Sequence, residues 1–146
     1  MPDQLDIGSL LFIAYRAMGD RVFAAITEAG YDDVTMAQFK LLQRINADGS
    51  RLSELAEAAQ VTKQTAGYLV DQLEAGGYVE RCPDPTDARA RLIRKTDKAQ
   101  AIHPVAVAAI AEIEAEWAAH LGKRRMDQVR EGLAKLREIT DPYLGR

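Results

Sequence analysis

The segment between residues 62 and 76 is predicted to be a helix that combines an apolar stripe with polar side chains able to hydrogen-bond to bases. The stripe follows the spacing i, i+3, i+4 and i+7 and consists of Ala66, Leu69, Val70 and Leu73. On a helical wheel, the opposite side carries Gln64, Gly67, Tyr68 and Asp71. A glutamine can pair bidentately with an adenine edge, a glycine lets the backbone come close, and a tyrosine can contact a base or a phosphate. This side of the helix is therefore predicted to enter the major groove of DNA.

Three further residues flank this face at the start of the helix, namely Thr62, Lys63 and Thr65. Together with the free amides of a helix N-terminus, they suit phosphate contacts, which set the register without reading sequence. Asp71 would be repelled by phosphate, so we assign it to the rear of the helix or to an intramolecular ion pair. An ordinary solvated helix face is the alternative for any one of these residues taken singly.

A run of basic residues follows a segment that proline makes rigid. Pro83 and Pro85 fix φ in the segment 83–88, and Arg89 and Arg91 stand just past it. Behind them the run continues with Arg94, Lys95 and Lys98, against Asp87 and Asp97. An arginine on a projecting hairpin suits the narrow, strongly negative minor groove of A/T-rich DNA. We expect Arg89 and Arg91 to contact DNA and Asp87 to position Arg89; the alternative is a solvated charged surface.

The pattern of residues 51–96 predicts the fold that would position the polar face of the helix and the basic residues of the hairpin. A helix with the stripe Leu52, Leu55, Ala56 and Ala59 precedes the reading helix, and its small alanines allow a steep crossing. Ser53 and Thr62 are the expected N-caps. Residues 78–82 and 90–96 are predicted strands on either side of the tip at 83–88. Two helices at a tight turn and then a hairpin make a mainly α fold with a small β-hairpin wing, the winged helix-turn-helix.

Helical patterns flank this module on both sides. An amphipathic helix is predicted over 5–29 with Gly30 at its C-terminus, and the capping-box pattern of Thr35 and Gln38 begins a second helix that stops near Asp48 and Gly49. From Thr96 the chain returns to helix, and past Gly122 the apolar spacing approximates a heptad seam. These apolar faces exceed what the small module can cover. We expect homodimerisation through the terminal helices, the alternative being that they pack on one another within a monomer.

Composition limits the classes of protein that the chain can represent. Its 146 residues, 47% of them hydrophobic, suit a single domain, and the net charge of −3 argues against coating nucleic acid by bulk electrostatics. The one cysteine, Cys82, excludes an internal disulfide framework and fits a reducing cytosol. No apolar run reaches the length of a membrane span, and the acidic start MPDQLD lacks the basic region of a signal peptide. The sequence thus predicts a cytoplasmic protein without membrane contact.

Evidence for catalysis or metal binding is weak. The sequence has no nucleophile elbow, phosphate-cradling glycine loop or zinc-protease helix, so we expect no enzyme and no cofactor. Glu116 and His120, at i and i+4, form only half a metal site, and His103 is not at ligand spacing from them. Cys82 stands beside Arg81, and a sensor role for its thiol is the alternative to an incidental strand cysteine, which is the simpler interpretation.

Four segments in order resemble the MarR family of bacterial winged helix-turn-helix transcription regulators. They are LSELA at 52–56, VTKQT at 61–65, LVDQLEAGGYVER at 69–81 and DPTDAR at 84–89, which holds the D-x-R pattern of the family's wing. With the flanking helices, the resemblance covers nearly the whole chain. It implies one domain over 1–146, with a winged-helix part at 33–98 and dimerisation helices at 5–30 and 97–144. It also implies a homodimer on a pseudo-palindromic operator of double-stranded DNA.

The resemblance also implies a small, commonly aromatic ligand in a cleft beside the dimer helices. Tyr15, Met18, Phe39, Ile113 and Trp117 could line such a cleft, although aromatic and methionine residues at helical spacing are usually core. Family members often have a hydroxyl residue and an arginine where this chain has Gly67 and Tyr68, so no operator sequence carries over. The peroxide-sensing members place cysteines in the first helix, which has none here.

The interpretation that unites these patterns is a homodimeric, ligand-responsive repressor with two reading heads about 34 Å apart, one turn of DNA. The main alternative is a winged-helix dimer that binds another protein or serves a structural role without DNA, for which the acidic net charge is the best support. A small-molecule carrier is a third.

Overall fold

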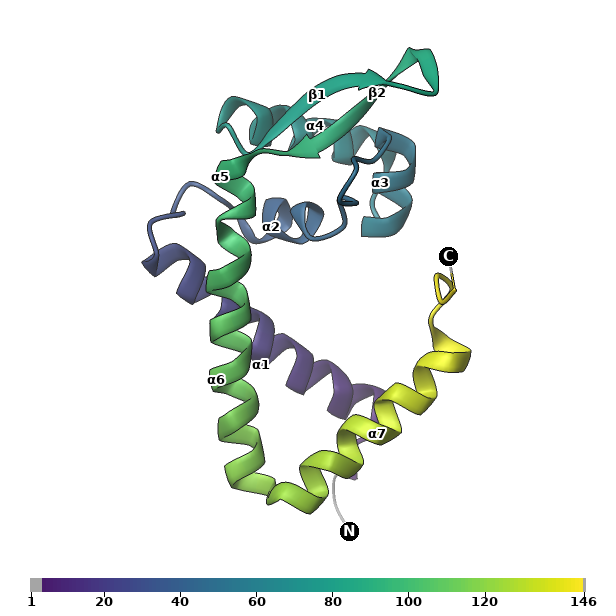
Figure 1. The fold of residues 1–146 in the computed structure, drawn as a ribbon. Coiled ribbons are helices and arrows are strands. Elements are labelled where there is room, and N and C mark those ends of the chain that lie inside the picture. Colours follow the sequence, from purple (N-terminus) through teal and green to yellow (C-terminus); the bar gives the residue numbers. More distant parts are fainter. Residues whose placement is uncertain (1–3, 146) are drawn as a thin grey trace. The chain divides into compact units, whose positions relative to one another are not determined.

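The computed structural model describes residues 4–145, and Figure 1 shows the path of the chain. Its elements are α1 (Ile7–Glu28), α2 (Met36–Leu42), α3 (Leu52–Ala59), α4 (Lys63–Ala75), β1 (Val79–Asp84), β2 (Asp87–Lys95), α5 (Asp97–Gln100), α6 (Ile102–Leu121) and α7 (Lys123–Thr140). The chain divides into two compact units, one that ends at Val107 and one that begins at Ala108. Half of the acidic start MPDQLD, on which the expectation of no signal peptide rests, lies outside the described residues.

Side-chain caps begin most of the helices in the first unit. Thr35 and Gln38 form the predicted capping box of α2, and the Thr62 hydroxyl accepts the Thr65 amide at 3.0 Å at the start of α4. The predicted cap at Ser53 is wrong. Helix α3 begins at Leu52 with Arg51 in the N-cap position and no side-chain cap. The Arg51 side chain instead bonds to the wing, which leaves Ser53 within the first turn of the helix.

The winged-helix core forms between α2, α3, α4 and the hairpin, which lies across one side of α4 (Figure 1). All four stripe residues of α4 are buried, as predicted, and so are Leu41 of α2, Leu55 of α3, Ile93 of β2 and Tyr78 just before β1. In the α3 stripe, Leu55 and Ala56 are buried while Leu52 and Ala59 are only half-buried. Burial of the α4 stripe turns its polar side outward, because the two sides of one helix cannot both face the core.

Helix α2 ends at Leu42, six residues before the expected stop near Asp48. The segment after it is held against the sheet, where Ser50 and Ile93 exchange backbone hydrogen bonds of 3.0 and 2.8 Å. Gly49 has φ of +101°, and a Cβ there would lie 3.2 Å from the Leu92 side chain, so only glycine fits. Pairing with a strand distant in sequence overrides the helical pattern that Ile45 had appeared to continue.

The wing is an antiparallel pair in which Val79 lies opposite Lys95, with a register shift between Pro83 and Asp84. Both strands run into the segment that the sequence pattern assigned to the tip, and only Pro85 and Thr86 remain as the turn. Asp84 explains the short turn, because its carboxylate accepts the Thr86 amide at 2.8 Å and the Thr86 hydroxyl at 2.7 Å. The tip projects away from the helices of this unit (Figure 1).

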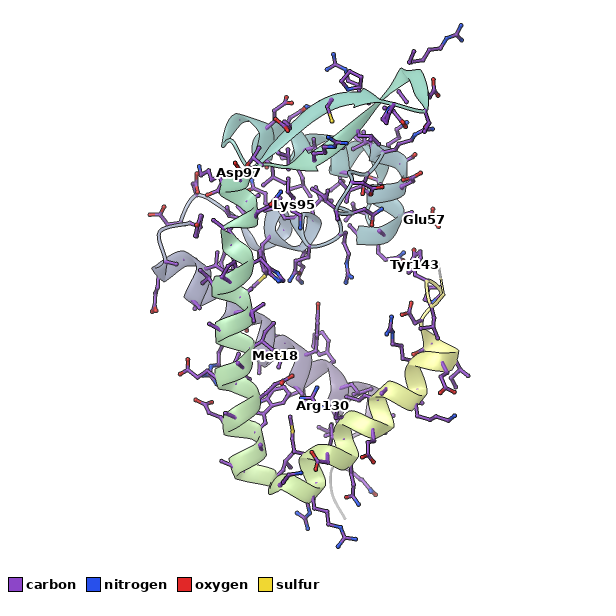
Figure 2. All side chains as sticks on the ribbon, in the orientation of Figure 1. Met18, Glu57, Lys95, Asp97, Arg130 and Tyr143 are labelled. Atoms are coloured by element: carbon purple, nitrogen blue, oxygen red, sulfur yellow. The ribbon has the colours of Figure 1, made fainter. Side chains whose placement is uncertain are left out.

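In the second unit, Gly122, with φ of +87°, separates the end of α6 from α7. Arg130, labelled in Figure 2, bonds to Glu114 at 2.9 Å and ties α7 to α6. Helix α7 has no buried residue, and it leaves exposed Val129, Leu133, Leu136 and Ile139. Across residues 4–145, no helix is both long enough and apolar enough to span a membrane.

Candidate nucleic-acid interface

The outer face of α4 carries the predicted base-reading side chains. Lys63, Gln64 and Thr65 are exposed, and the Tyr68 side chain is 63% exposed. Gly67 is only half-buried and lies toward α3, since a Cβ added to it would be 3.7 Å from Leu52. The face is therefore polar, protruding and weakly basic, and it occupies the part of the helix nearest the N-terminus, where free amides favour anions.

Arg81 on β1 neutralises the acidic end of α4. Its guanidinium bonds to Asp71 at 2.7 Å and to Glu74 at 2.8 Å. The Asp71 hydrogen bond and both negative charges raise the pKa of Arg81. Asp71 thus makes the intramolecular pair expected from its sequence position. The same contact clamps the wing strand to the reading helix, a role that the sequence pattern did not indicate.

Two arginines near the tip of the wing are not neutralised by carboxylates of the described residues. Arg89 and Arg91 are exposed, and neither guanidinium pairs with a carboxylate anywhere in residues 4–145. Asp87 accepts the backbone N–H of Arg89 at 3.0 Å, while its other oxygen lies 3.8 Å from Arg51. Asp87 therefore shapes the backbone that carries Arg89 without holding its side chain.

Two other members of the basic run make tertiary contacts. Arg94 donates to the Asp48 carbonyl at 3.3 Å. Lys98 donates to the Gly76 carbonyl at 2.7 Å and lies 4.2 Å from the centre of the Tyr78 ring. The predicted five-residue patch is thus divided, because Arg94 and Lys98 bond to backbone carbonyls near the helices, while Arg89 and Arg91 near the tip bond to no carboxylate within residues 4–145.

Arg51 anchors the wing from a position 33 residues before it. Its Nε donates to Asp84 at 2.9 Å, and a second nitrogen lies 2.8 Å from the same carboxylate oxygen. The Thr86 amide and hydroxyl, and then Arg51, hold the pKa of the buried Asp84 at about 2. The local sequence could not identify Arg51 as the residue that anchors the wing, because a single arginine before a helix does not indicate which distant carboxylate it pairs with.

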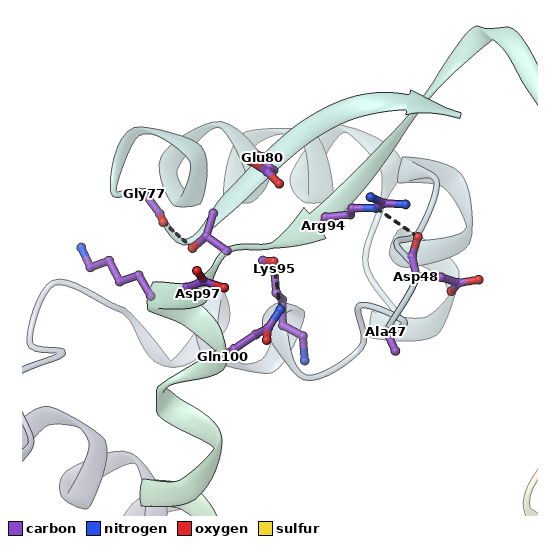
Figure 3. A pocket seen from close by; sticks show the side chains of 10 residues that line it. Ala47, Asp48, Gly77, Glu80, Arg94, Lys95, Asp97 and Gln100 are labelled. Carbon is purple, nitrogen blue, oxygen red and sulfur yellow. Dashed lines mark hydrogen bonds between the residues drawn. The ribbon is translucent and has the colours of Figure 1, made fainter. Parts of the chain in front are cut away.

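A hollow of about 670 Å³ lies at the base of the hairpin, where Arg94, Lys95 and Lys98 face Asp48, Glu80 and Asp97 (Figure 3). Within it, Arg94 donates to the backbone carbonyl of Asp48, and Gln100 donates to the Lys95 carbonyl at 3.5 Å. None of the five residues proposed from the sequence for a ligand cleft lines it.

Those five residues occupy different environments. Phe39 and Ile113 are buried at 6% and 2% exposure, which makes them core. Tyr15 is 60% exposed and Trp117 is half-buried. Met18, which is labelled in Figure 2, is also half-buried. Tyr15, Met18 and Phe39 belong to the first compact unit, and Ile113 and Trp117 belong to the second. Within residues 4–145, no group of three or more His, Cys, Asp or Glu residues could hold a metal ion.

Three comparisons place this geometry among known proteins. Residues 32–90 match the sequence profile of the MarR family. The uncharacterised HTH-type transcriptional regulator YybA of Bacillus subtilis is 28% identical over 74 residues, which are 50% of this chain and 49% of YybA. The chain spans about half the length of the curated relatives that it matches, 49% and 44% for two of them.

Solved structures extend the likeness to nearly the full chain. The transcriptional regulator Tm0710 of Thermotoga maritima is 26% identical, with a TM-score of 0.68 over 95% of this chain and 96% of Tm0710. Wild-type MarR of Escherichia coli shares the fold with a TM-score of 0.75 over 92% of this chain and 98% of its own, at 24% identity. Residues 32–90, which hold the helix-turn-helix and most of the wing, thus match the MarR family, and the chain has the fold of MarR winged helix-turn-helix proteins.

Proposed function

We propose that this chain regulates transcription, acting as a homodimeric repressor in the bacterial cytoplasm that binds a pseudo-palindromic operator and responds to a small aromatic ligand. One observation carries the DNA-binding part. On a single hairpin, Arg81 is neutralised by two carboxylates, whereas Arg89 and Arg91 are exposed and unneutralised by any residue from 4 to 145. In an acidic chain, free arginines concentrated at a projecting tip fit a polyanion.

Each part of the module has a distinct role in this proposal. Gln64 and Tyr68 read base edges in the major groove, whereas Gly67, which lies toward Leu52, lets α4 approach α3 closely. Thr62, Lys63 and Thr65 contact phosphate and set the register. Arg89 enters the adjacent minor groove while Asp87 shapes its backbone, and Arg91 neutralises a phosphate.

The exposed apolar surfaces support a homodimer. Helix α7 leaves Leu133 and Ile139 at 44% and 84% exposure, and the first turns of α1 leave Ile7 and Phe12 at 73% and 61%. Exposed apolar side chains repeated along two helices are typical of a protein interface. A second copy of the chain is the proposed partner, and it brings two reading heads to half-sites about ten base pairs apart.

The proposed ligand response can be tested through Trp117. A ligand that changed the spacing of the reading heads would release DNA. Trp117 is the only tryptophan, so a panel of small aromatic acids can be tested by its fluorescence. Saturable quenching together with loss of operator binding supports the response, and binding without loss of DNA points to a carrier.

The decisive experiment is selection of bound duplexes from a random pool at about physiological salt, with Arg89→Ala and Gln64→Ala as variants. Recovery of a palindrome with half-sites about ten base pairs apart supports the proposal. If the folded, dimeric protein enriches no sequence and its weak retention of DNA does not respond to salt, the proposal fails. The chain is then better explained as a protein-interaction dimer.

A further inference from the structure

Three hydrogen bonds connect the capping box of α2, with its buried Gln38, to the exposed face of α4. The backbone N–H of Thr35 donates to Oε1 of Gln38 at 3.1 Å. Nε2 of Gln38 donates to Oε1 of Gln72 at 3.0 Å, and Nε2 of Gln72 donates to the Tyr68 hydroxyl at 3.1 Å. Gln38 is 6% exposed and Tyr68 is 63% exposed, so the chain of bonds runs from the core to the proposed DNA surface.

The direction of this chain follows from its first member. A backbone N–H can only donate, so the oxygen of the Gln38 side chain must face Thr35, and its NH₂ group must face Gln72. The oxygen of Gln72 then accepts, which turns its NH₂ group toward Tyr68. The Tyr68 oxygen therefore accepts a hydrogen bond on its inner side, and its own O–H points outward. Within the part of the chain that the structure describes, no acceptor is bonded to that O–H.

Building on the proposed function, we propose that Tyr68 donates a hydrogen bond from its hydroxyl group to an acceptor on DNA, and that Gln72 positions Tyr68 for this contact. The acceptors available in the major groove are O6 and N7 of guanine, N7 of adenine and O4 of thymine; phosphate oxygens offer the same chemistry. The amino groups of cytosine and adenine are donors, so this tyrosine does not pair with them.

The contact with Gln72 also restricts the Tyr68 side chain before DNA arrives. The two residues are one helical turn apart, and Gln72 is itself held by Gln38 on another helix. A side chain already held in its binding orientation loses less conformational entropy on association. Gln72 is thus a positioning residue that acts through Tyr68.

The test is a double-mutant cycle on the selected operator, with Tyr68→Phe, Gln72→Glu and the double variant. In Gln72→Glu, both carboxylate oxygens accept, one from Gln38 and the other from the Tyr68 O–H, so the tyrosine proton turns inward. Tyr68→Phe removes one hydrogen bond in each half-site, so at about tenfold per bond it should weaken binding of the dimer about a hundredfold. Gln72→Glu should likewise cost about a hundredfold more in the wild-type background than in the Tyr68→Phe background, and its added charge is the same in both comparisons.

The two sources of acceptor are distinguished by repeating the selection with each variant. Loss of preference at one position per half-site identifies a base edge, and an equal loss on every sequence identifies a phosphate. A second readout needs no DNA: Tyr68→Phe should shift the side-chain NH₂ resonances of Gln72 in the free protein. If Gln72→Glu costs the same factor in both backgrounds, or if those resonances do not move, the relay is overturned while the proposed function stands. Failure of the wild type to enrich any duplex overturns both.

Discussion

Replacing Arg91 with alanine is expected to flatten the salt dependence of operator binding. Lys63, Arg89 and Arg91 are exposed, and no carboxylate within residues 4–145 neutralises them, so a dimer presents six such cations. Six neutralised phosphates give a slope of log K against log salt of about −5, or about a thousandfold loss of affinity between 50 and 200 mM salt. With two cations removed, the slope should be about −3.6 and the loss about a hundredfold.

The measurement is fluorescence anisotropy with a labelled operator at four salt concentrations, for the wild type, Arg91→Ala and Arg81→Met. Arg81→Met is the matched control, because it removes one positive charge from the same hairpin but from a guanidinium already held by Asp71 and Glu74. It should weaken binding and leave the slope near the wild-type value. Equal slopes for the wild type and Arg91→Ala, with both proteins folded, would refute the claim that Arg91 is free to neutralise a phosphate.

Gln64→Ala should relax the preference at one base position per half-site, and Arg89→Ala should weaken binding most on A/T-rich flanks; selection with each variant measures both, and equal loss on all sequences would contradict these roles. Leu73→Ala, at 1% exposure in the wild type, should lower the free energy of unfolding by about 3 kcal/mol in urea titrations, whereas a loss below about 1 kcal/mol would mean that the core readily refills the space. The pKa of Asp84 is lowered from 3.8 to about 2, so its bonds stabilise the fold above pH 3.8 and this contribution disappears as the pH falls through 2; Asp84→Asn should remove that part of the acid sensitivity, and an unchanged profile of unfolding midpoint against pH would argue against it.

Local sequence was sufficient for the elements and for the orientation of the reading helix. The stripe of four apolar residues on α4 predicted both the buried side and the polar side, because a helix of period 3.6 segregates them without help from the rest of the chain. Thr35 and Thr62 were identifiable as caps since each bonds to an amide three residues away. The order of the MarR-like segments then predicted the winged-helix fold.

Predictions from local sequence patterns were wrong where a contact with a residue distant in sequence changed the local structure. The segment after Leu42 has helical spacing, yet Ser50 pairs with Ile93 and the helix ends early. Ser53 is a good capping residue by type, but the Arg51 side chain reaches Asp84 and the helix starts one residue before Ser53. In both cases a contact between residues more than 30 positions apart outweighs a propensity worth only about 1 kcal/mol.

Only the tertiary structure determined which charged side chains of the candidate interface are paired within the protein and which are free. In the sequence, Arg81, Arg89 and Arg91 are three similar residues in one short segment, and only the packing of β1 on α4 brings Asp71 and Glu74 to the first of them. The direction of the Tyr68 proton likewise depends on Gln38, 34 residues before Gln72. Periodicity and caps are encoded within a few residues, and the sequence therefore determined the elements and their polar faces. Ion pairing and hydrogen-bond direction depend on which elements meet, and the folded chain alone determines that.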